Sequence, residues 1–144
     1  MVKLLQYSFI VLLIYSCEPT GSSIGPCVHT YEEPVLTIQS VSSAETGNKI
    51  STLEIFNVKI DNVSGNPASL IDEVSENISV EDSILICTIP CGFGTMEGTY
   101  EFAVKADGFK DSIIYKSAQY NKLEGGCPSS SSDGTKISFS LIPE

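Results

Sequence analysis

The stretch Thr99-Tyr100-Glu101-Phe102-Ala103-Val104-Lys105-Ala106 decides the fold class of this 144-residue chain. Apolar side chains stand at every second position, from Tyr100 to Ala106, and the positions between them are mostly polar. Successive side chains of a β-strand point to opposite faces of its sheet, so this alternation is typical of a strand with one buried face. The pattern therefore predicts a strand over 99–106 that packs Tyr100, Phe102 and Val104 into a core.

Short apolar runs on both sides of this stretch predict an all-β domain. They are rich in Ile, Val and Tyr, and turn-forming Gly, Asn, Asp and Ser residues separate them. We expect further strands at 35–41, 53–60, 83–89, 112–120 and 137–141. Between the strands expected at 53–60 and 83–89, Ile78 and Val80 alternate like an edge strand. A short helical turn over 70–74 is an alternative. About seven strands at this spacing predict a single antiparallel β-sandwich over 34–144.

One expected strand carries an irregularity that the sequence itself reveals. Within 53–60, the alternation of apolar residues changes parity between Ile55 and Phe56. A β-bulge inserts one extra residue into a strand and shifts which side chains face the core. We therefore expect a bulge at this point.

Two stretches resemble the carboxypeptidase-regulatory-like, or transthyretin-like, β-sandwich domains of bacterial surface proteins. The first is 35–50, a strand followed by the Thr46-Gly47 turn, and the second is 98–109, an aromatic strand between glycine turns. The segment 87–94 also resembles one that recurs in lipoproteins with this domain. The resemblance implies a transthyretin-like or immunoglobulin-like sandwich that serves as a stalk or binding module without catalysis.

The first sixteen residues differ in composition from the rest of the chain. Lys3 is their only charge, and 4–15 is almost entirely apolar, too short to cross a membrane but typical of a secretory signal. The segment ends in Leu13-Ile14-Tyr15-Ser16-Cys17, which resembles the lipobox of bacterial lipoproteins. This resemblance implies cleavage before Cys17 and attachment of lipid to its thiol. Several acyl chains anchor a protein stably in a membrane.

The lipobox divides the chain into three parts and implies a compartment. These parts are a signal peptide (1–16), a lipidated cysteine with a flexible tether (17–33) and the β-sandwich domain (34–144). The lipid predicts a location in the cell envelope, and Glu18 after the lipidated cysteine resembles the sorting signal of enterobacterial lipoproteins, which implies the outer membrane rather than the inner one.

The charge of the mature chain excludes one class of partner. Without residues 1–16 the chain has 7 lysines, no arginine and 18 acidic residues, which gives a net charge of −11. Nucleic-acid binding needs a basic patch that displaces counterions from phosphates, so we expect no nucleic-acid partner.

Four cysteines remain once Cys17 is assigned to lipid, namely Cys27, Cys87, Cys91 and Cys127. An even number in an oxidising compartment indicates two disulfides, and three pairings are open. Zinc held by Cys87 and Cys91 is the alternative, because their spacing suits metal ligands. Alternating strand directions place the start of the first strand and the tip loops 88–98 and 121–134 at one end. We therefore expect all four cysteines to gather there.

No combination of residues predicts catalysis. His29 is the only histidine and no serine stands in a nucleophile motif, so a hydrolase using His29 is a distant alternative. We predict no metal or cofactor, because the acid-rich stretch 72–82 lacks the spacing of a calcium loop. Phe93, between two glycines, is a candidate ligand contact, and burial under its own loop is the alternative.

The sequence thus predicts a lipid-anchored envelope protein that acts as a non-catalytic structural or binding module with an unidentified ligand. The alternative function is a surface adhesin that binds a glycan or a protein through the tip loops 88–98 and 121–134. An exposed Phe93 would favour the adhesin, and a buried Phe93 would favour a structural module.

Overall fold

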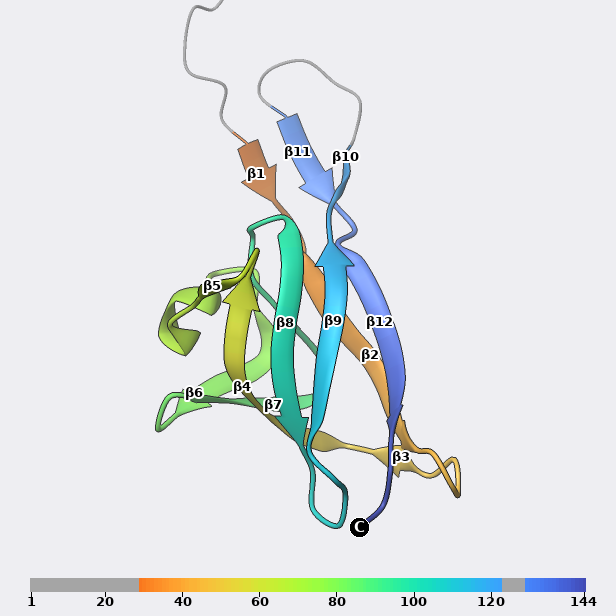
Figure 1. Cartoon of the computed structure of the whole chain (residues 1–144). Helices are drawn as coiled ribbons and strands as arrows, with labels where there is room; N and C mark the ends of the chain where they lie inside the picture. Colours follow the sequence, from red (N-terminus) through yellow and green to blue (C-terminus); the bar gives the residue numbers. More distant parts are fainter. Residues whose placement is uncertain (1–28, 123–128) are drawn as a thin grey trace, which may run out of the picture.

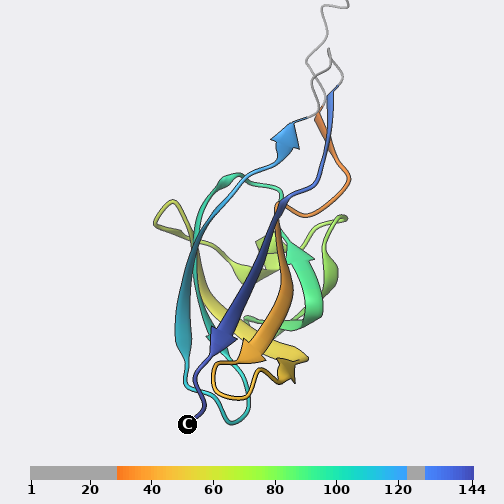
Figure 2. The same ribbon diagram turned by 90° about the vertical axis from the view of Figure 1, so that its right-hand side faces the viewer.

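Figures 1 and 2 show the computed structural model, which describes residues 29–122 and 129–144. Within these ranges the regular structure is β-strand apart from one 3-10 turn, η2 (Pro67–Leu70), which confirms the all-β class. The strands are β1 (His29–Tyr31), β2 (Leu36–Ser43), β3 (Lys49–Ile50), β4 (Thr52–Ile60), β5 (Val63–Ser64), β6 (Glu76–Glu81), β7 (Ile84–Phe93), β8 (Gly98–Lys105), β9 (Ser112–Ala118), β10 (Asn121–Lys122), β11 (Ser129–Ser132) and β12 (Thr135–Leu141).

The main sheet has the strand order β12-β2-β7-β4-β8-β9 and curls until its two edges lie near each other (Figures 1 and 2). The short strands β3, β5 and β6 pair with β2, β4 and β7 at its margins. Neighbours along the path are antiparallel except β12 and β2, which run parallel. The expected antiparallel sandwich is therefore confirmed, with the parallel pair β12–β2 as the exception along this path.

The strand that decided the fold class behaves as its alternation predicts. The side chains of Tyr100, Phe102 and Val104 on β8 are fully buried. The predicted bulge is also confirmed, slightly further along β4: the register with β8 shifts between Phe56 and Lys59. Asn57 has a φ of 52°, a left-handed conformation that lets the strand absorb the extra residue.

The stretch that the sequence left least defined contains both expected features. Ile78 and Val80 lie in β6, which pairs only with β7. The helical turn forms at Pro67–Leu70 rather than over 70–74, because Asn66 caps it there: its Oδ1 accepts a hydrogen bond from the Ala68 backbone N–H at 3.1 Å.

A small second sheet, β1-β11-β10, extends one end of the sandwich (Figure 1). β1 pairs with β11 in parallel, His29 beside Ser129. The aromatic ring of Tyr31 stacks on that of Tyr120 with centroids 4.9 Å apart. The tether predicted over 17–33 is therefore too long, because 29–31 already belong to the folded domain; we call this end of the molecule the tether end.

Candidate functional site

The cysteines that the structure describes lie in the core and not in a tip loop. Cys87 and Cys91, both on β7, form a disulfide with Cα atoms 5.7 Å apart, and both are buried. The disulfide spans the point where the pairing partner of β7 changes from β4 to β2. Cys87 is opposite Leu53 on β4, and Cys91 is opposite Ile38 on β2. A disulfide is confirmed, and the zinc alternative is wrong because both sulfurs are bonded to each other.

Three further cysteines of the prediction lie outside the described residues. They are the expected lipid site and two disulfide candidates: Cys17, Cys27 and Cys127. The expected gathering of four cysteines at one end is wrong for Cys87 and Cys91, because a central strand carries both of them.

Phe93, the candidate ligand contact, is completely buried. Its ring meets Tyr100 and Phe102 edge-on, with centroids 6.0 and 6.1 Å away. The expected tip loop 88–98 is β-strand as far as Phe93. The Phe93 ring therefore points into the hydrophobic core. The prediction of a ligand contact is corrected: Phe93 is part of the hydrophobic core.

Hydrogen bonds join the segments of the tether end to one another. The Val35 backbone N–H donates to the Gly94 carbonyl at 2.6 Å, and the Thr135 N–H donates to the Val35 carbonyl at 2.8 Å. The Tyr120 N–H donates to Glu97 Oε1 at 3.0 Å. The first strand is expected to start at the same end as the tip loops 88–98 and 121–134; its start is bonded to Gly94 and Thr135, and residues 123–128 of the second loop lie outside the described residues. His29 begins β1 at this end, and its side chain lies outside the description.

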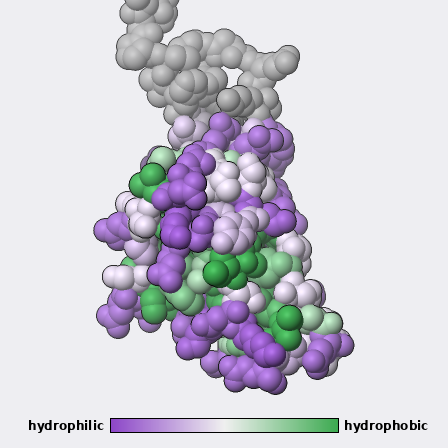
Figure 3. Space-filling view, in the orientation of Figure 1, coloured by the Kyte–Doolittle hydropathy of each residue, from purple (hydrophilic) through white to green (hydrophobic). Residues whose placement is uncertain are grey.

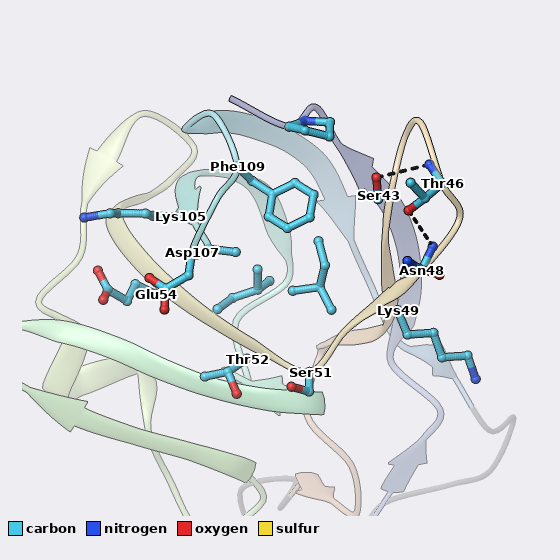
Figure 4. A pocket seen from close by; sticks show the side chains of 14 residues that line it. Ser43, Thr46, Asn48, Lys49, Ser51, Thr52, Glu54, Lys105, Asp107 and Phe109 are labelled. Atoms are coloured by element: carbon cyan, nitrogen blue, oxygen red, sulfur yellow. Dashed lines mark hydrogen bonds between the residues drawn. The ribbon is translucent and has the colours of Figure 1, made fainter.

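The opposite end carries a groove that the sequence did not predict (Figure 4). It has a volume of about 580 Å³, within the range of small-molecule sites. Its lining comes from three parts of the chain: 43–54 around the β2–β3 turn, 105–109 around the β8–β9 turn, and Pro143. We call this cavity the distal groove.

Turns with defined hydrogen bonds position the walls of the distal groove. The Ser43 hydroxyl accepts hydrogen bonds at 3.3 Å from the backbone N–H groups of Glu45 and Thr46. On the other side, the Phe109 N–H donates to the Ala106 carbonyl at 3.1 Å, and Gly108 supplies the positive φ of 79° that this turn requires. The conformations of both turns are therefore fixed by the protein itself, without a ligand.

The segment after β12 holds the Phe109 turn from outside. The Lys110 N–H donates to the Ile142 carbonyl at 2.9 Å, and the Glu144 N–H donates to the Gly108 carbonyl at 3.1 Å. Phe109 also forms a β-bridge with Pro143. The half-buried Phe109 ring thus projects into the middle of the groove from a turn that is fixed on two sides (Figure 4).

Several polar side chains of the distal groove have no partner among the described residues and are therefore available to a ligand. Within the described part of the chain, five of them have no side-chain hydrogen bond and no ion pair: Asn48, Ser51, Thr52, Glu54 and Asp107. Lys105 stands opposite Glu54 in the β4–β8 register but extends away from the Phe109 ring. The groove therefore offers free acceptors and hydroxyls next to an aromatic ring.

A second groove, of about 520 Å³, lies beside the β4 bulge. It differs from the distal groove because its charged side chains are paired. Its charged residues, Lys59 and Glu101, form a salt bridge with each other at 2.7 Å. The hydrogen bond with Glu101 raises the pKa of the Lys59 amine. These two charges satisfy each other, so this groove presents less free polar chemistry than the distal groove.

Two further surface features of the described residues bear on binding: the extent of apolar area and the grouping of metal-ligating side chains. On the face seen in Figure 3, apolar areas are small and lie between hydrophilic ones. Among residues 29–122 and 129–144, no three His, Cys, Asp or Glu side chains are grouped as a metal would need. The same residues contain no helix of the length and apolarity that a membrane span requires.

Comparison with known proteins adds no relative: no protein-family model, no curated protein and no solved structure matches this chain. The function therefore has to be argued from the residues and the geometry described above.

Proposed function

We propose that this protein is a lipid-anchored, non-catalytic binding module of the cell envelope, which presents the distal groove away from the membrane that holds it. One observation carries the proposal: the groove lies at the end of the sandwich farthest from residue 29, where the described chain begins (Figure 1). A lipid on Cys17 would hold the tether end nearest the bilayer and leave the groove open to its surroundings.

The internal bonding of the two ends supports this division of roles. Backbone and side-chain hydrogen bonds close the tether end, and Phe93 is buried in the core beside it. The distal groove has free polar side chains around an aromatic ring, so it offers a ligand both hydrogen bonds and an apolar contact. The adhesin alternative placed binding on the tip loops 88–98 and 121–134; burial of Phe93 favours a site elsewhere, and we place binding at the distal end.

Metabolic labelling with an alkyne-bearing fatty acid tests the anchor. The full chain, expressed in a bacterium that processes lipoproteins, is expected to incorporate the label and to fractionate with membranes. Cys17→Ser should abolish both, and Cys27→Ser is the matched control that should keep both. A wild-type chain that stays unlabelled and soluble would contradict the anchor.

A photo-crosslinker tests the binding role independently of the ligand's chemistry. We place p-benzoylphenylalanine at position 46, in the wall of the distal groove, in cells that display the full chain. The control position is 63, where Val63 is 71% exposed outside the groove. The proposal expects an adduct from position 46 and none from position 63. Equal yields, or no adduct from either position, would reject the binding role.

A further inference from the structure

From the chemistry of the distal groove we infer its ligand class: an uncharged saccharide, one face of which stacks on Phe109 while its hydroxyls bind the free polar side chains. This inference rests on the proposed binding role and adds the identity of the ligand. The charge of the lining, its free acceptors and its single aromatic ring all favour such a ligand.

The charge of the lining argues against a strongly charged ligand. Two lysines, Lys49 and Lys105, stand against two acids, Glu54 and Asp107, so the groove is formally neutral in a chain of net charge −10. Figure 4 shows both lysines extending away from the Phe109 ring. An anionic ligand would find no cation directed at it.

The free polar groups match a ligand with many hydroxyls. Glu54 and Asp107 are acceptors only, and hydrogen bonds to an ionised carboxylate are stronger than those between neutral groups. Ser51 and Thr52 both donate and accept, and the Asn48 amide does the same with two separate groups. A sugar hydroxyl is both donor and acceptor, so it can pair with every one of these side chains.

The aromatic ring supplies the apolar contact that a saccharide also needs. A pyranose has one face covered by C–H groups, which packs against the electron-rich face of an aromatic ring. Phe109 projects into the groove from a turn that is fixed by hydrogen bonds to the segment after β12. Because these bonds already hold the turn, little ordering entropy is lost when a ligand binds.

The test measures binding of the full, detergent-extracted chain to a printed panel of neutral hexose and N-acetylhexosamine oligosaccharides. A second panel carries the same sugars with sulfate or carboxylate groups. We expect binding on the neutral panel, and Phe109→Leu should weaken it at least about tenfold. Leucine keeps apolar volume at this half-buried position, so the fold is retained while the flat ring is lost.

Tyr115→Leu is the matched control, since Tyr115 is an aromatic residue on β9 that is 60% exposed and lies outside the groove. Its affinity should equal that of the wild type. Asp107→Asn should weaken binding without changing stability, because the amide is a weaker acceptor than the carboxylate.

Three outcomes would overturn the saccharide inference: binding of charged glycans alone, no binding on either panel, or equal affinity of wild type and Phe109→Leu. The crosslinking result separates this failure from failure of the binding role. A protein adduct at position 46 without glycan binding rejects the saccharide and retains the module. No adduct and no glycan binding rejects both.

Discussion

The two ends of the sandwich use polar residues in opposite ways. At the tether end, backbone groups of Val35, Gly94 and Thr135 bond to one another, and Tyr120 is held between Tyr31 and the Glu97 carboxylate. In the distal groove, the side chains of Glu54 and Asp107 form no hydrogen bond or ion pair with another described residue. Satisfied polar groups at the first end contribute to stability, whereas free polar groups at the second contribute little to it and are available for a ligand.

The largest effect on stability is expected when a glycine at the tether end, Gly134, is replaced by alanine. A Cβ on Gly134 would overlap the Pro34 carbonyl oxygen and lie 2.7 Å from the Val35 carbonyl carbon, so two backbone segments would have to separate. We expect Gly134→Ala to lower the free energy of unfolding by about 3 kcal/mol or more, measured by urea denaturation.

The matched control for this glycine lies at the distal groove. Gly108 has a positive φ of 79°, unlike Gly134, and a Cβ there meets nothing within 4 Å. Gly108→Ala should therefore cost only the left-handed strain, about 1–2 kcal/mol. Equal losses for the two variants would show that the tether end is not packed more tightly than the groove end.

The second largest effect on stability is expected when a disulfide between Cys27 and Cys127 is removed. We predict this disulfide from the strand register. The bond between Cys87 and Cys91 leaves these two cysteines, and His29 pairs with Ser129 in the parallel β1–β11 ladder. Each remaining cysteine precedes its paired residue by two positions. Their thiols would lose two hydrogens to a thiol–disulfide oxidant of the envelope.

Peptide mapping under non-reducing conditions measures this bond directly, as a peptide with Cys27 linked to one with Cys127. The double variant Cys27→Ser, Cys127→Ser should lose about 2–4 kcal/mol of stability, because the bond closes a long loop. Recovery of both cysteines as alkylated free thiols would contradict the prediction and leave β1 held by its ladder and the Tyr31–Tyr120 stack alone.

The fold was predictable where the sequence pattern expresses a local rule. The alternation from Tyr100 to Ala106 reports burial on one face, and the parity change after Ile55 reports the bulge. The parallel pairing of β2 with β12 was not predictable, because it depends on how residues far apart in the sequence meet. The same holds for Phe93, whose flanking glycines indicate a loop although Phe93 is the last residue of β7 and is buried in the core.

The distal groove could not be predicted from the sequence for a related reason. Its residues come from turns separated by more than fifty positions, and each turn alone resembles an ordinary solvated loop. Phe109 belongs to the stretch 98–109 that carries the family resemblance, where the aromatic residues indicate core packing rather than a groove. Only the pairing of β4 with β8 brings Glu54 and Lys105 together and gives the groove its neutral lining.

The third effect is a dependence of stability on alkaline pH at the tether end. Burial raises the pKa of the Tyr120 hydroxyl to about 12, and that hydroxyl donates to the Glu33 carbonyl at 3.2 Å. An unfolded tyrosine titrates near pH ~10, so above that pH the unfolded state loses a proton that the folded state keeps. The contribution is complete below pH ~10 and is lost as pH rises toward 12.

Urea unfolding between about pH 9 and pH 11 measures this loss. Tyr120→Phe should make the decline shallower, because phenylalanine has no proton to release. Tyr115→Phe is the control, since Tyr115 is exposed and its removal should leave the slope as it is. An identical slope in all three proteins would show that Tyr120 does not couple the tether end to pH.

The smallest effect is expected where the proposed function is concentrated. Asn48, Thr52 and Asp107 make no side-chain hydrogen bond within the described residues, so removing their polar groups breaks no interaction of the fold. We expect Asn48→Ala, Thr52→Ala and Asp107→Asn each to change the free energy of unfolding by less than about 0.5 kcal/mol. A loss near that of Gly134→Ala would mean that these groups hold the fold together, and the contrast between the two ends would fail. Unchanged stability combined with weakened saccharide binding would show that these polar groups serve the ligand and not the fold.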